Sequence, residues 1–372
     1  MNLLYISSIV GNKYSGLTSA ISNHVDAQSK YDSVFWYNLV ELKTDIYTEN
    51  VECHTVKDYP NGTITSLPAP FNHPQLVIFE DIYYISFLKI AKQCKQLNIP
   101  YIVVPHCCLC SLAQKRKRIK KCIGNILLFS RFIKKAAAIH FLTEKEYLDS
   151  GKKWNANHFV IPNGITMPQI QNQKRVESEL VGTFIGRLDI FQKGIDLLIN
   201  AATLAKTLLK QNNLHINIYG ADSVGDKNRI IAMIKNNQLE DFVSIYNPVF
   251  DDDKKQVLLN SDFFILTSRF EGHPMGLIEA LAYGLPSLVT DGTNMGEEIA
   301  SYNAGWVCKC TPESISEGLK TIVEERHRMH DLQINAKELA KQYSWDKIAQ
   351  SAHENYQRII SGERICEQWK MF

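Results

Sequence analysis

The sequence predicts an α/β protein of two doubly wound domains, each built around a parallel sheet. At 372 residues the chain is long enough for two domains of ordinary size. Short apolar runs alternate with helical patterns almost from end to end, as expected of parallel strands covered by helices on both faces. One polar, proline-containing stretch without an apolar period, Thr166–Glu179, divides the chain into halves of similar size and is expected to be a linker.

The first half contains six apolar runs of strand length. Helical patterns lie between them, for example at Leu17–Gln28 and Ile85–Leu97. Because each run is almost continuously apolar, both faces of these strands are expected to be buried. The expected strands are Leu3–Val10, Val34–Val40, Leu76–Phe79, Tyr101–Pro105, Ala136–Leu142 and His158–Ile161.

The second half repeats this scheme, and a final helical segment, Trp345–Ile365, is expected to cross back onto the first domain. We therefore expect an N-terminal domain at residues 1–170, a C-terminal domain at 171–345 and a crossover helix at 346–372. Since such sheets bind ligands beyond the carboxyl ends of their strands, a cleft between the domains is the expected site. The expected strands are Leu180–Ile185, His215–Tyr219, Val243–Tyr246, Phe263–Thr267, Ser287–Thr290 and Gly305–Cys308.

The composition is that of a globular protein. Hydrophobic residues make up 45% and charged residues 22% of the chain, and no apolar run reaches the length of a transmembrane helix. Asn2–Val10 has no basic residues before it and lacks a signal-peptide cleavage pattern, so it is expected to be a buried strand. A formal net charge of +2 gives no indication of a nucleic-acid partner.

The nine cysteines are scattered and odd in number, as expected of reduced thiols in the cytosol. Cys107, Cys108 and Cys110 lack a second cysteine pair at a zinc-binding distance, which favours small buried thiols over a metal site. Cys308 and Cys310 have the same interpretation. The expected location is therefore the cytoplasm.

The most informative motif is Glu271–Glu279, which reads EGHPMGLIE. It follows the apolar run Phe263–Thr267 and opens a helical pattern, so it predicts a strand, a tight loop and a helix. A helix N-terminus offers unpaired backbone N–H groups and a positive dipole end to a phosphate. Gly276 removes the side chain that would hold an anion away, and Glu279 falls early in the helix, where a carboxylate can reach a ribose hydroxyl.

A second motif, Phe184–Gly194 (FIGRLDIFQKG), stands at another strand end before the helical pattern Ile195–Leu209. Arg187 and Lys193 are two cations on one loop, which suits a diphosphate. Ordinary surface charges are the alternative interpretation. That alternative does not explain why glycine-flanked cations and glycine-flanked carboxylates both open helices after parallel-type strands.

Three motifs resemble the retaining glycosyltransferases of family 4, which have the GT-B fold: Gly186–Gly194 (GRLDIFQKG), Glu271–Pro286 (EGHPMGLIEALAYGLP) and Ile161–Ile165 (IPNGI). Those enzymes move a sugar from a nucleotide-sugar donor to an acceptor and keep the anomeric configuration. The resemblance covers nearly the whole second half of the chain. In the first half it rests on the order of elements and a few positions.

The resemblance implies a role for each matching residue. Arg187 and Lys193 grip the donor diphosphate and stabilise the departing nucleotide, Glu271 lies near the donor sugar, and Glu279 binds the ribose hydroxyls. The turn that meets the sugar and phosphate is Met275, Gly276 and Leu277. The loop that lines the base is Tyr246, Asn247 and Pro248, and contacts around His273 affect the choice of donor sugar.

In the first domain, His106 resembles the family histidine that faces the donor sugar and acceptor, and Gly11 and Gly16 lie in the loop that approaches the diphosphate. The chain departs from the family twice here. The two glycines are separated by Asn12–Ser15 instead of being adjacent, and His106 is followed by two cysteines. A structural histidine is the competing interpretation of His106.

An enzyme of this kind that uses no metal neutralises the leaving nucleoside diphosphate with fixed cations and helix dipoles. Arg187, Lys193 and the amides near Gly276 supply that set. Asp251–Asp253 suit the acidic N-terminus of a helix better than a metal site. We therefore expect a metal-independent hexosyltransferase without a cofactor and with a UDP-sugar as donor, and the resemblance implies a front-face displacement in which the leaving phosphate takes the acceptor's proton.

The segment Gln114–Cys122 (QKRKRIKKC) is basic, and apolar residues interleave with it and follow it. Such a segment can lie on an anionic membrane surface, which would place the protein on the inner face of the membrane and make a lipid-linked glycan the acceptor. A solvated basic helix whose apolar side faces its own core explains the pattern equally well. Nucleic-acid binding is disfavoured, because the segment has no aromatic platform. The basic residues are Lys115, Arg116, Lys117, Arg118, Lys120 and Lys121.

Other functions on the same architecture remain as alternatives. A non-catalytic partner of a true transferase would be expected to lose the Arg–Lys pair or the paired glutamates, and this chain keeps all four. A phosphorylase would need a pyridoxal-phosphate lysine, which the sequence does not place. Dinucleotide binding is disfavoured, because no GxGxxG follows the first strand.

Overall fold

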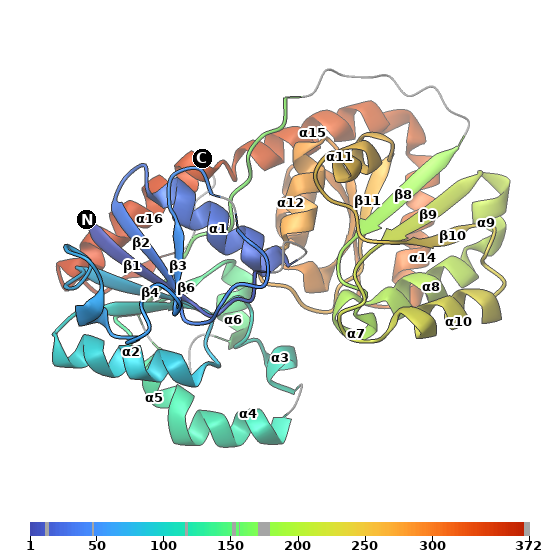
Figure 1. The fold of residues 1–372 in the computed structure, drawn as a ribbon. Helices are drawn as coiled ribbons and strands as arrows, with labels where there is room; N and C mark the ends of the chain where they lie inside the picture. The colour runs from blue at the N-terminus through green and yellow to red at the C-terminus, as the bar shows by residue number, and fades with distance from the viewer. Residues whose placement is uncertain are drawn as a thin grey trace. The chain divides into compact units, whose positions relative to one another are not determined.

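The chain folds into two α/β units, each with its own parallel sheet and hydrophobic core (Figure 1). The computed structural model describes residues 1–11, 15–46, 48–115, 118–150, 154–155, 157–169 and 179–367. The first unit combines Met1–Gly164 with Trp345–Phe372, and the second is the continuous stretch Ile165–Ser344. Every helix that the structure describes is too short or too polar to cross a bilayer.

The first unit is built on an eight-stranded sheet in the order β14-β7-β6-β5-β4-β1-β2-β3, and every paired strand in it is parallel. Leu3–Ile6 and Leu76–Phe79 are completely buried, because helices cover both faces of the central strands. The strands are β1 (Asn2–Ser7), β2 (Ser33–Asn38), β3 (Cys53–Thr55), β4 (Leu76–Glu80), β5 (Tyr101–Val104), β6 (Ala138–Phe141), β7 (His158–Val160) and β14 (Cys366–Glu367).

The helices of the first unit include one segment with an irregular register between residues 118 and 134. There an α-helix, a π-helical turn and a second α-helix follow one another directly. The helices are α1 (Gly16–Gln28), α2 (Ile85–Gln96), α3 (Ser111–Lys115), α4 (Arg118–Gly124), the π-helical turn Asn125–Phe129, α5 (Ser130–Lys134), α6 (Glu144–Ser150) and α16 (Trp345–Ile360). A 3₁₀ turn lies at Ile64–Ser66.

The final helix α16 packs on α1, which confirms that the end of the chain crosses back to the first unit. Ile348 and Tyr356 are buried there, and the Tyr356 hydroxyl lies 3.5 Å from that of Tyr5 in β1. Lys30 Nζ donates to Asp346 at 2.8 Å. The strand β14 then extends the sheet beside β7, a pairing that the sequence pattern did not indicate.

The second unit has a six-stranded parallel sheet in the order β10-β9-β8-β11-β12-β13. The strands are β8 (Leu180–Ile185), β9 (Leu214–Tyr219), β10 (Val243–Tyr246), β11 (Phe263–Leu266), β12 (Ser287–Thr290) and β13 (Gly305–Cys308). The helices are α7 (Ile190–Lys193), α8 (Ile195–Leu204), α9 (Lys206–Gln211), α10 (Lys227–Asn236), α11 (Asp251–Leu259), α12 (Met275–Ala282), α13 (Gly296–Ser301), α14 (Pro312–Glu324) and α15 (Met329–Lys341), with 3₁₀ turns at Asp291–Thr293 and Arg326–Arg328.

The expected bounds of β8, β10, β12 and β13 are confirmed, but the single helix expected at Ile195–Leu209 is wrong, because the chain turns at Ala205 between α8 and α9. Asp251–Asp253 lie in the first turn of α11, as expected of an acidic helix N-terminus. Most of the expected linker, residues 170–178, lies outside the described residues.

The structure divides the chain a few residues earlier than the sequence pattern indicated. Ile165 N–H donates to the Tyr343 carbonyl at 2.6 Å, and Ile165 pairs with Ser344 as an isolated bridge. Both contacts tie residue 165 to the end of the second unit. Trp345 belongs to the first unit, where its ring stacks on His24 of α1 at 6.4 Å.

Candidate functional site

The second unit gathers predicted donor residues where the strand order of its sheet reverses. The strands β8, β9 and β10 follow one another outward, and β11 lies on the other side of β8. Ligands of doubly wound sheets bind beyond the carboxyl ends of the strands at such a switch point. The loops that leave β8 and β11, residues 186–194 and 267–274, carry the two motifs found in the sequence.

Lys193 and Glu271 come together across these two loops. Lys193 Nζ donates to Glu271 Oε1 at 2.6 Å, and the Lys193 and Glu271 side chains are 14% and 9% exposed. Ser268 Oγ also donates to Glu271 Oε1, at 2.6 Å, and Asn294 Nδ2 donates to the Glu271 carbonyl. The pair is therefore fixed at its acidic end and holds one ammonium group at the switch point.

The loop between Gly186 and Gly194 is shaped by its own side chains. Asp189 caps α7 by accepting from the Gln192 amide at 2.9 Å, and Gln192 Oε1 accepts from the Arg187 guanidinium at 2.9 Å. Arg187 is exposed. Its charge thus lies on the same loop as Lys193 and is open to solvent, whereas Lys193 is largely enclosed.

Gly194 joins α7 to α8 with a left-handed backbone, φ 62°. A Cβ placed there would lie 2.0 Å from the Thr267 carbonyl oxygen. The Thr267 hydroxyl in turn donates to the Gly194 carbonyl at 3.0 Å. The absence of a side chain at Gly194 lets the two site loops touch, which is what brings Lys193 to Glu271.

The N-terminus of α12 lies against the end of β8. A Cβ on Gly276 would lie 3.2 Å from the Ile185 carbonyl oxygen, so the first turn of α12 approaches the loop that carries Arg187. Among the residues that the structure describes, no side chain caps this helix, and its first turn contains no acidic residue. The first amides of a helix lack partners within the helix and carry its positive dipole end, so the turn suits an anion. Met275 is half-buried at the start of the helix, whereas the Leu277 side chain is fully buried in the core.

Glu279 lies one turn further along α12 and forms an ion pair with Lys254 of α11. Both side chains are about one quarter exposed. The carboxylate therefore remains accessible but is held by a cation that the sequence analysis assigned no role.

The residues expected to line the base lie at the carboxyl end of β10, two strands away from β8. Tyr246 is 43% exposed and stacks on Tyr219, at the end of β9, with ring centroids 4.7 Å apart. Lys227 Nζ donates to Asn247 Oδ1 at 3.3 Å, and Pro248 follows in the same loop. The structure therefore places this loop on the same edge of the sheet as Lys193 and out of direct contact with it.

His273 is enclosed by its own unit. It is 5% exposed, and its ring lies 4.9 Å from that of Tyr343. Burial lowers the pKa of His273 to about 3, so the imidazole is neutral at physiological pH. Its packing favours a role in shaping the loop between β11 and α12.

In the first unit, His106 follows β5 and contacts Glu80, the last residue of β4. The His106 Nε2–H donates to Glu80 Oε2 at 2.6 Å, and the Glu80 side chain is fully buried. Burial lowers the pKa of His106, but the hydrogen bond and the charge of Glu80 outweigh it, so the pKa is raised overall. A second histidine, His24, lies 3.8 Å from the other Glu80 oxygen, and burial with the charge of His106 lowers its pKa to about 4.

The His106 loop has an unusual backbone. His106 and Cys107 are both left-handed, with φ 44° and 66°. The buried carboxylate of Glu146 accepts from the Cys107 amide at 2.6 Å and from the Leu142 amide at 2.9 Å, which ties this loop to the end of β6. Non-glycine residues hold such conformations only where the surroundings impose them, and they cluster at functional sites.

The two glycines of the first loop differ in their surroundings. Gly11 has φ 68°, and a Cβ there would lie 2.2 Å from the Thr44 carbonyl oxygen, so the loop at residues 42–44 already requires a glycine. Gly16 is exposed at the start of α1. Residues 12–14, on which the departure from the family pattern rests, lie outside the described residues.

Of the cysteines near His106, Cys107 and Cys110 are buried, as expected of small core thiols. Cys108 is partly buried, and burial, with the charge of Asp81, raises the pKa of its thiol well above the usual range. A thiol with a raised pKa is a poor nucleophile at neutral pH. These cysteines therefore act as packing residues of the loop.

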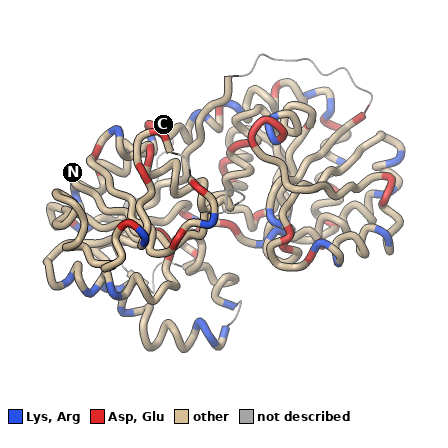
Figure 2. The backbone as a smooth tube through the Cα atoms, in the orientation of Figure 1, with Lys and Arg blue, Asp and Glu red and all other residues tan. Residues whose placement is uncertain are grey.

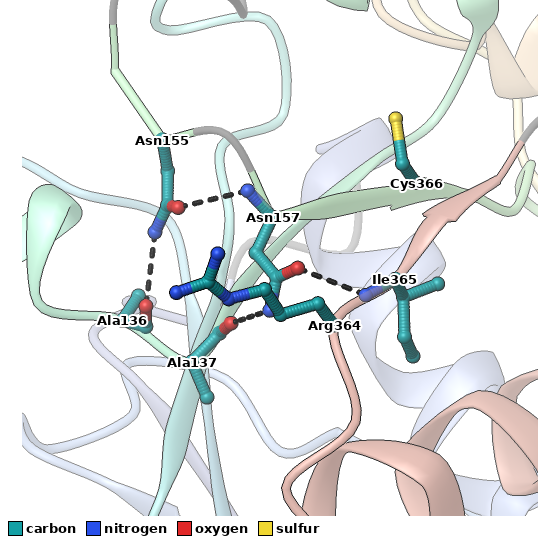
Figure 3. Close-up of a pocket in the computed structure, with 7 residues that line it drawn as sticks. All are labelled: Ala136, Ala137, Asn155, Asn157, Arg364, Ile365 and Cys366. Atoms are coloured by element: carbon teal, nitrogen blue, oxygen red, sulfur yellow. Dashed lines mark hydrogen bonds between the residues drawn. The ribbon is translucent and has the colours of Figure 1, made fainter.

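A pocket of about 470 Å³ in the first unit lies away from all of these residues (Figure 3). Its lining comes from the amino ends of β6, β7 and β14, the edge opposite to the one where such sheets bind ligands. Figure 3 shows that its amides are used within the chain, since Asn157 Nδ2 donates to the Ala137 carbonyl at 2.6 Å and Asn157 Oδ1 accepts from the Ile365 amide at 2.8 Å. These bonds attach β14 to the sheet, so this hollow is structural.

Sequence reasoning missed Glu80, Glu146 and Lys254. Glu80 had a signal, since it is a carboxylate at the end of the buried apolar run LVIFE. Glu146 had none, because its partner Cys107 is 39 residues away and belongs to another loop. Lys254 follows three aspartates, and its partner Glu279 is 25 residues further along the chain.

Comparison with known proteins gives a family match for the second unit. Residues 167–339 match the family model described as glycosyl transferases group 1. Both motifs that meet at the switch point lie within the matched stretch.

Several curated relatives each match more than half of this chain, at 26–30% identity. An uncharacterized glycosyltransferase of Methanocaldococcus jannaschii is 26% identical over 216 residues, which are 58% of this chain and 57% of that protein. The Campylobacter jejuni N-acetylgalactosamine-N,N'-diacetylbacillosaminyl-diphospho-undecaprenol 4-alpha-N-acetylgalactosaminyltransferase is 30% identical over 198 residues, 52% of this chain and 52% of that protein. The chain thus matches about half the length of these relatives.

Solved structures match over nearly the whole chain. Sucrose-phosphate synthase of Thermosynechococcus elongatus has a TM-score of 0.74 at 14% identity and covers 98% of this chain and 100% of its own. HepE of Anabaena, solved in complex with UDP, has a TM-score of 0.72 at 16% identity. The match covers 96% of this chain and 100% of the HepE chain. At these identities the likeness concerns the fold, and it confirms the expected GT-B architecture of two Rossmann-like units.

Proposed function

We propose that this chain is a retaining, metal-independent glycosyltransferase of family 4 that moves a sugar from a UDP-sugar to a glycan or lipid-linked acceptor. The observation that carries the proposal is the meeting of Lys193 and Glu271 at the switch point of the second sheet, beside the N-terminus of α12. The glycosyl transferases group 1 match over residues 167–339 supports it independently.

The charges at this point suit a nucleoside diphosphate that leaves a sugar. Lys193 and Arg187 carry two positive charges against one negative charge on Glu271, and the dipole of α12 adds to the positive side. When the sugar–phosphate bond breaks, negative charge builds up on the diphosphate, and groups already in place stabilise it without reorganisation. Glu271 keeps the Lys193 ammonium group in position until the diphosphate arrives.

The remaining donor residues suit a nucleoside in size and chemistry. Neighbouring parallel strands are about 4.8 Å apart, so the end of β10 lies about 10 Å from that of β8 along the sheet. The exposed ring of Tyr246 and the amide of Asn247 can bind a base there, and Glu279 can accept from the ribose hydroxyls. The complex of the structural relative HepE with UDP supports uracil as the base.

The acceptor side of the proposal rests on the first unit. Glu80 raises the pKa of His106 and so favours the doubly protonated ring, whose Nδ1–H can donate a hydrogen bond to a sugar hydroxyl. The Campylobacter relative is named for a diphospho-undecaprenol-linked acceptor, which supports a lipid-linked glycan as the acceptor class. We assign the location accordingly to the cytoplasmic face of a membrane.

The test is a donor screen with matched variants. Thermal shift and hydrolysis are measured with UDP-, GDP- and ADP-sugars, with and without EDTA, and the anomeric configuration of the product is read by NMR. Because Lys193 stabilises the leaving group, Lys193→Ala is expected to lose about 100- to 1,000-fold in turnover, and Glu279→Ala is expected to raise the KM of the donor. The exposed Lys320→Ala, on α14, serves as the control.

Near-normal turnover in folded Lys193→Ala would refute the assigned site. Inversion of configuration, or loss of activity in EDTA, would refute the proposed mechanism while leaving donor binding intact. Stabilisation by GDP or ADP instead of UDP would correct the base and leave the rest of the proposal standing.

A further inference from the structure

The helix α4 and the π-helical turn Asn125–Phe129 that follows it expose an apolar stripe in the first unit. Ile119, Ile123, Ile126 and Leu127 follow the i, i+4, i+7, i+8 spacing by which a surface helix normally faces a core. Here they are 78%, 53%, 75% and 69% exposed, and none of the seven described residues of α4 is buried. Scattered exposed aliphatic residues are normal, but four on one stripe form a patch.

The π-helical turn Asn125–Phe129 explains why α4, before it, is exposed to solvent while α5, after it, is partly buried. Beyond it, Phe132 and Ile133 of α5 are buried, and the Phe132 ring lies 5.1 Å from that of Phe79 in β4. A π-helical turn inserts a residue into the helical register and so rotates the face that follows. The sequence alternative in which the apolar side of the basic helix faces its own core therefore holds for α5 and is wrong for α4, which Figure 1 shows at the outer edge of the unit.

The charge around this stripe has a single sign. Between Ile82 and Thr143 the sequence contains twelve Lys and Arg residues and no Asp or Glu. The rest of the chain carries the other 29 basic residues against all 39 acidic ones and is therefore net negative. Arg118, Lys120 and Lys134 are exposed beside the stripe, while Arg116 and Lys117 lie outside the described residues.

The basic residues share one face of the unit with the stripe. Phe87 of α2 and Phe132 of α5 both pack on Phe79 of β4, at 5.3 Å and 5.1 Å, so α2 and α5 cover the same face of the sheet. The outer sides of these helices carry exposed lysines and arginines, and Figure 2 shows basic residues along α2, α4 and α5. The exposed basic residues of α2 and α5 are Lys89, Lys92, Lys95, Arg131 and Lys134, and Lys135 follows directly.

We infer that this face, formed by α2, α4, the π-helical turn and α5, docks on the surface of an anionic lipid bilayer, with the apolar stripe inserted among the acyl chains. Bilayer association of an interfacial helix depends on buried apolar area together with attraction of basic residues to anionic headgroups, and this face offers both. Nucleic acid would use the charges but would leave the aliphatic stripe in water, and exposed aromatic stacking platforms are absent from the described residues of α4 and α5.

The docking face is connected to the acceptor loop, so the inference deepens the proposed function and rests on it for its biological meaning. Gln114 of α3 donates to the Cys108 carbonyl at 2.6 Å, two residues after His106. The Asn125 amide, at the start of the π-helical turn, donates to Gln114 Oε1 at 3.0 Å. A bilayer bound at α4 would therefore bring a lipid-linked acceptor to the unit that carries His106.

Vesicle co-sedimentation of the full chain tests the docking without any substrate. We expect binding to phosphatidylcholine vesicles that contain about 30 mol% phosphatidylglycerol, weak binding to pure phosphatidylcholine, and loss of binding as NaCl rises towards about 0.5 M. Ile126→Ser with Leu127→Ser should lower the partition coefficient about tenfold or more. Arg118→Glu with Lys120→Glu should lower binding to the anionic vesicles selectively.

Matched controls lie on the second unit. Ile231 and Ile334 are 46% and 48% exposed, so Ile231→Ser with Ile334→Ser removes similar apolar surface elsewhere. Lys210→Glu with Lys235→Glu reverses two exposed charges on α9 and α10. Equal sedimentation of wild-type chain and α4 variants, or equal binding to both vesicle types, would overturn the inference. So would a dimer, or RNA binding, that the α4 variants abolish while lipid binding is absent.

Failure of the proposed function is distinguishable from failure of the docking. UDP-sugar hydrolysis without vesicles should be unchanged in the α4 variants, whereas transfer to a lipid-linked acceptor in anionic vesicles should fall with their partition coefficient. If the wild-type chain hydrolyses no nucleotide-sugar but still sediments with anionic vesicles, the function is refuted and the docking stands.

Discussion

At the scale of single residues, two largely buried pairs each join a carboxylate to a basic side chain. Lys193 meets Glu271 in the second unit and His106 meets Glu80 in the first, each at 2.6 Å. A buried charge is costly unless it is paired, so each member explains the presence of the other. In each unit the pair stands at the carboxyl edge of the sheet, where doubly wound folds bind ligands.

The first prediction concerns the pH dependence that Glu80 imposes through His106. Because the pKa of His106 is raised in the folded chain, its protonation stabilises the fold fully below the unfolded value of about 6.5, and this contribution is lost as pH rises through the folded pKa. Glu80→Gln should therefore lower the free energy of unfolding most below about pH 6.5. Above that pH, the free energy of unfolding should fall less steeply with rising pH than in the wild-type chain. Urea unfolding between about pH 6 and 9 measures this.

The conservative control for this prediction is Glu363→Gln, a surface carboxylate paired with Arg358. If the free energy of unfolding varied with pH in the same way in Glu80→Gln and the wild-type chain, Glu80 would have no effect on the pKa of His106. The pH profile of transfer should change in the same variant, since the proton on His106 would be lost at lower pH.

At the scale of elements, the sequence could predict whatever depends on local pattern. The bounds of β8 and β12 follow from apolar runs that end at loop residues, and the strand–loop–helix arrangement of Glu271–Glu279 follows from its glycines and the helical period after it. The sequence pattern could not predict contacts between segments that are distant along the chain. The exposure of α4 is an example, because its apolar period is that of a buried helix and only the π-helical turn decides which part is buried.

The second prediction compares two glycines with left-handed backbones. Gly194 has φ 62°, and a methyl group added there would lie 2.0 Å from a carbonyl oxygen, whereas Gly225 has φ 83° and nothing within 4 Å of the same position. Gly225→Ala should cost only the conformational strain, about 1 kcal/mol. Gly194→Ala should cost about 3 kcal/mol or more, since the two site loops must separate. Urea unfolding gives both values, and equal losses would contradict the assigned crowding.

At the scale of the whole molecule, the two units differ in how the chain builds them. The second is one continuous stretch, whereas the first needs α16 from the far end of the sequence. That helix buries Trp345, Ile348, Tyr356 and Ile359 in the first unit. At about 1.5–3 kcal/mol for each large apolar side chain, the helix contributes roughly 6–12 kcal/mol, which is comparable with the stability of a whole domain.

The third prediction is that a chain ending at Ser344 keeps the second unit folded and loses the first. Hydrogen exchange should show that the amides of β1 and β4 lose protection while those of β8 and β11 keep it. A chain ending at Gly362 retains α16 and removes residues 363–372, which include β14, so it should resemble the full chain. Protection of β1 in the shorter chain would show that α1 and the sheet suffice without α16.

The interrupted course of the first unit also sets the order of events on the ribosome. Domains ordinarily fold as they emerge, the N-terminal one first, at a synthesis rate of about 5–20 residues per second. Here residues 1–164 are translated before the 180 residues of the second unit and α16, so we expect the first unit to complete its packing only after a delay of roughly ten to forty seconds. During that interval the face of α1 that packs on α16 stays exposed to solvent. We therefore expect a chaperone to bind the nascent chain there.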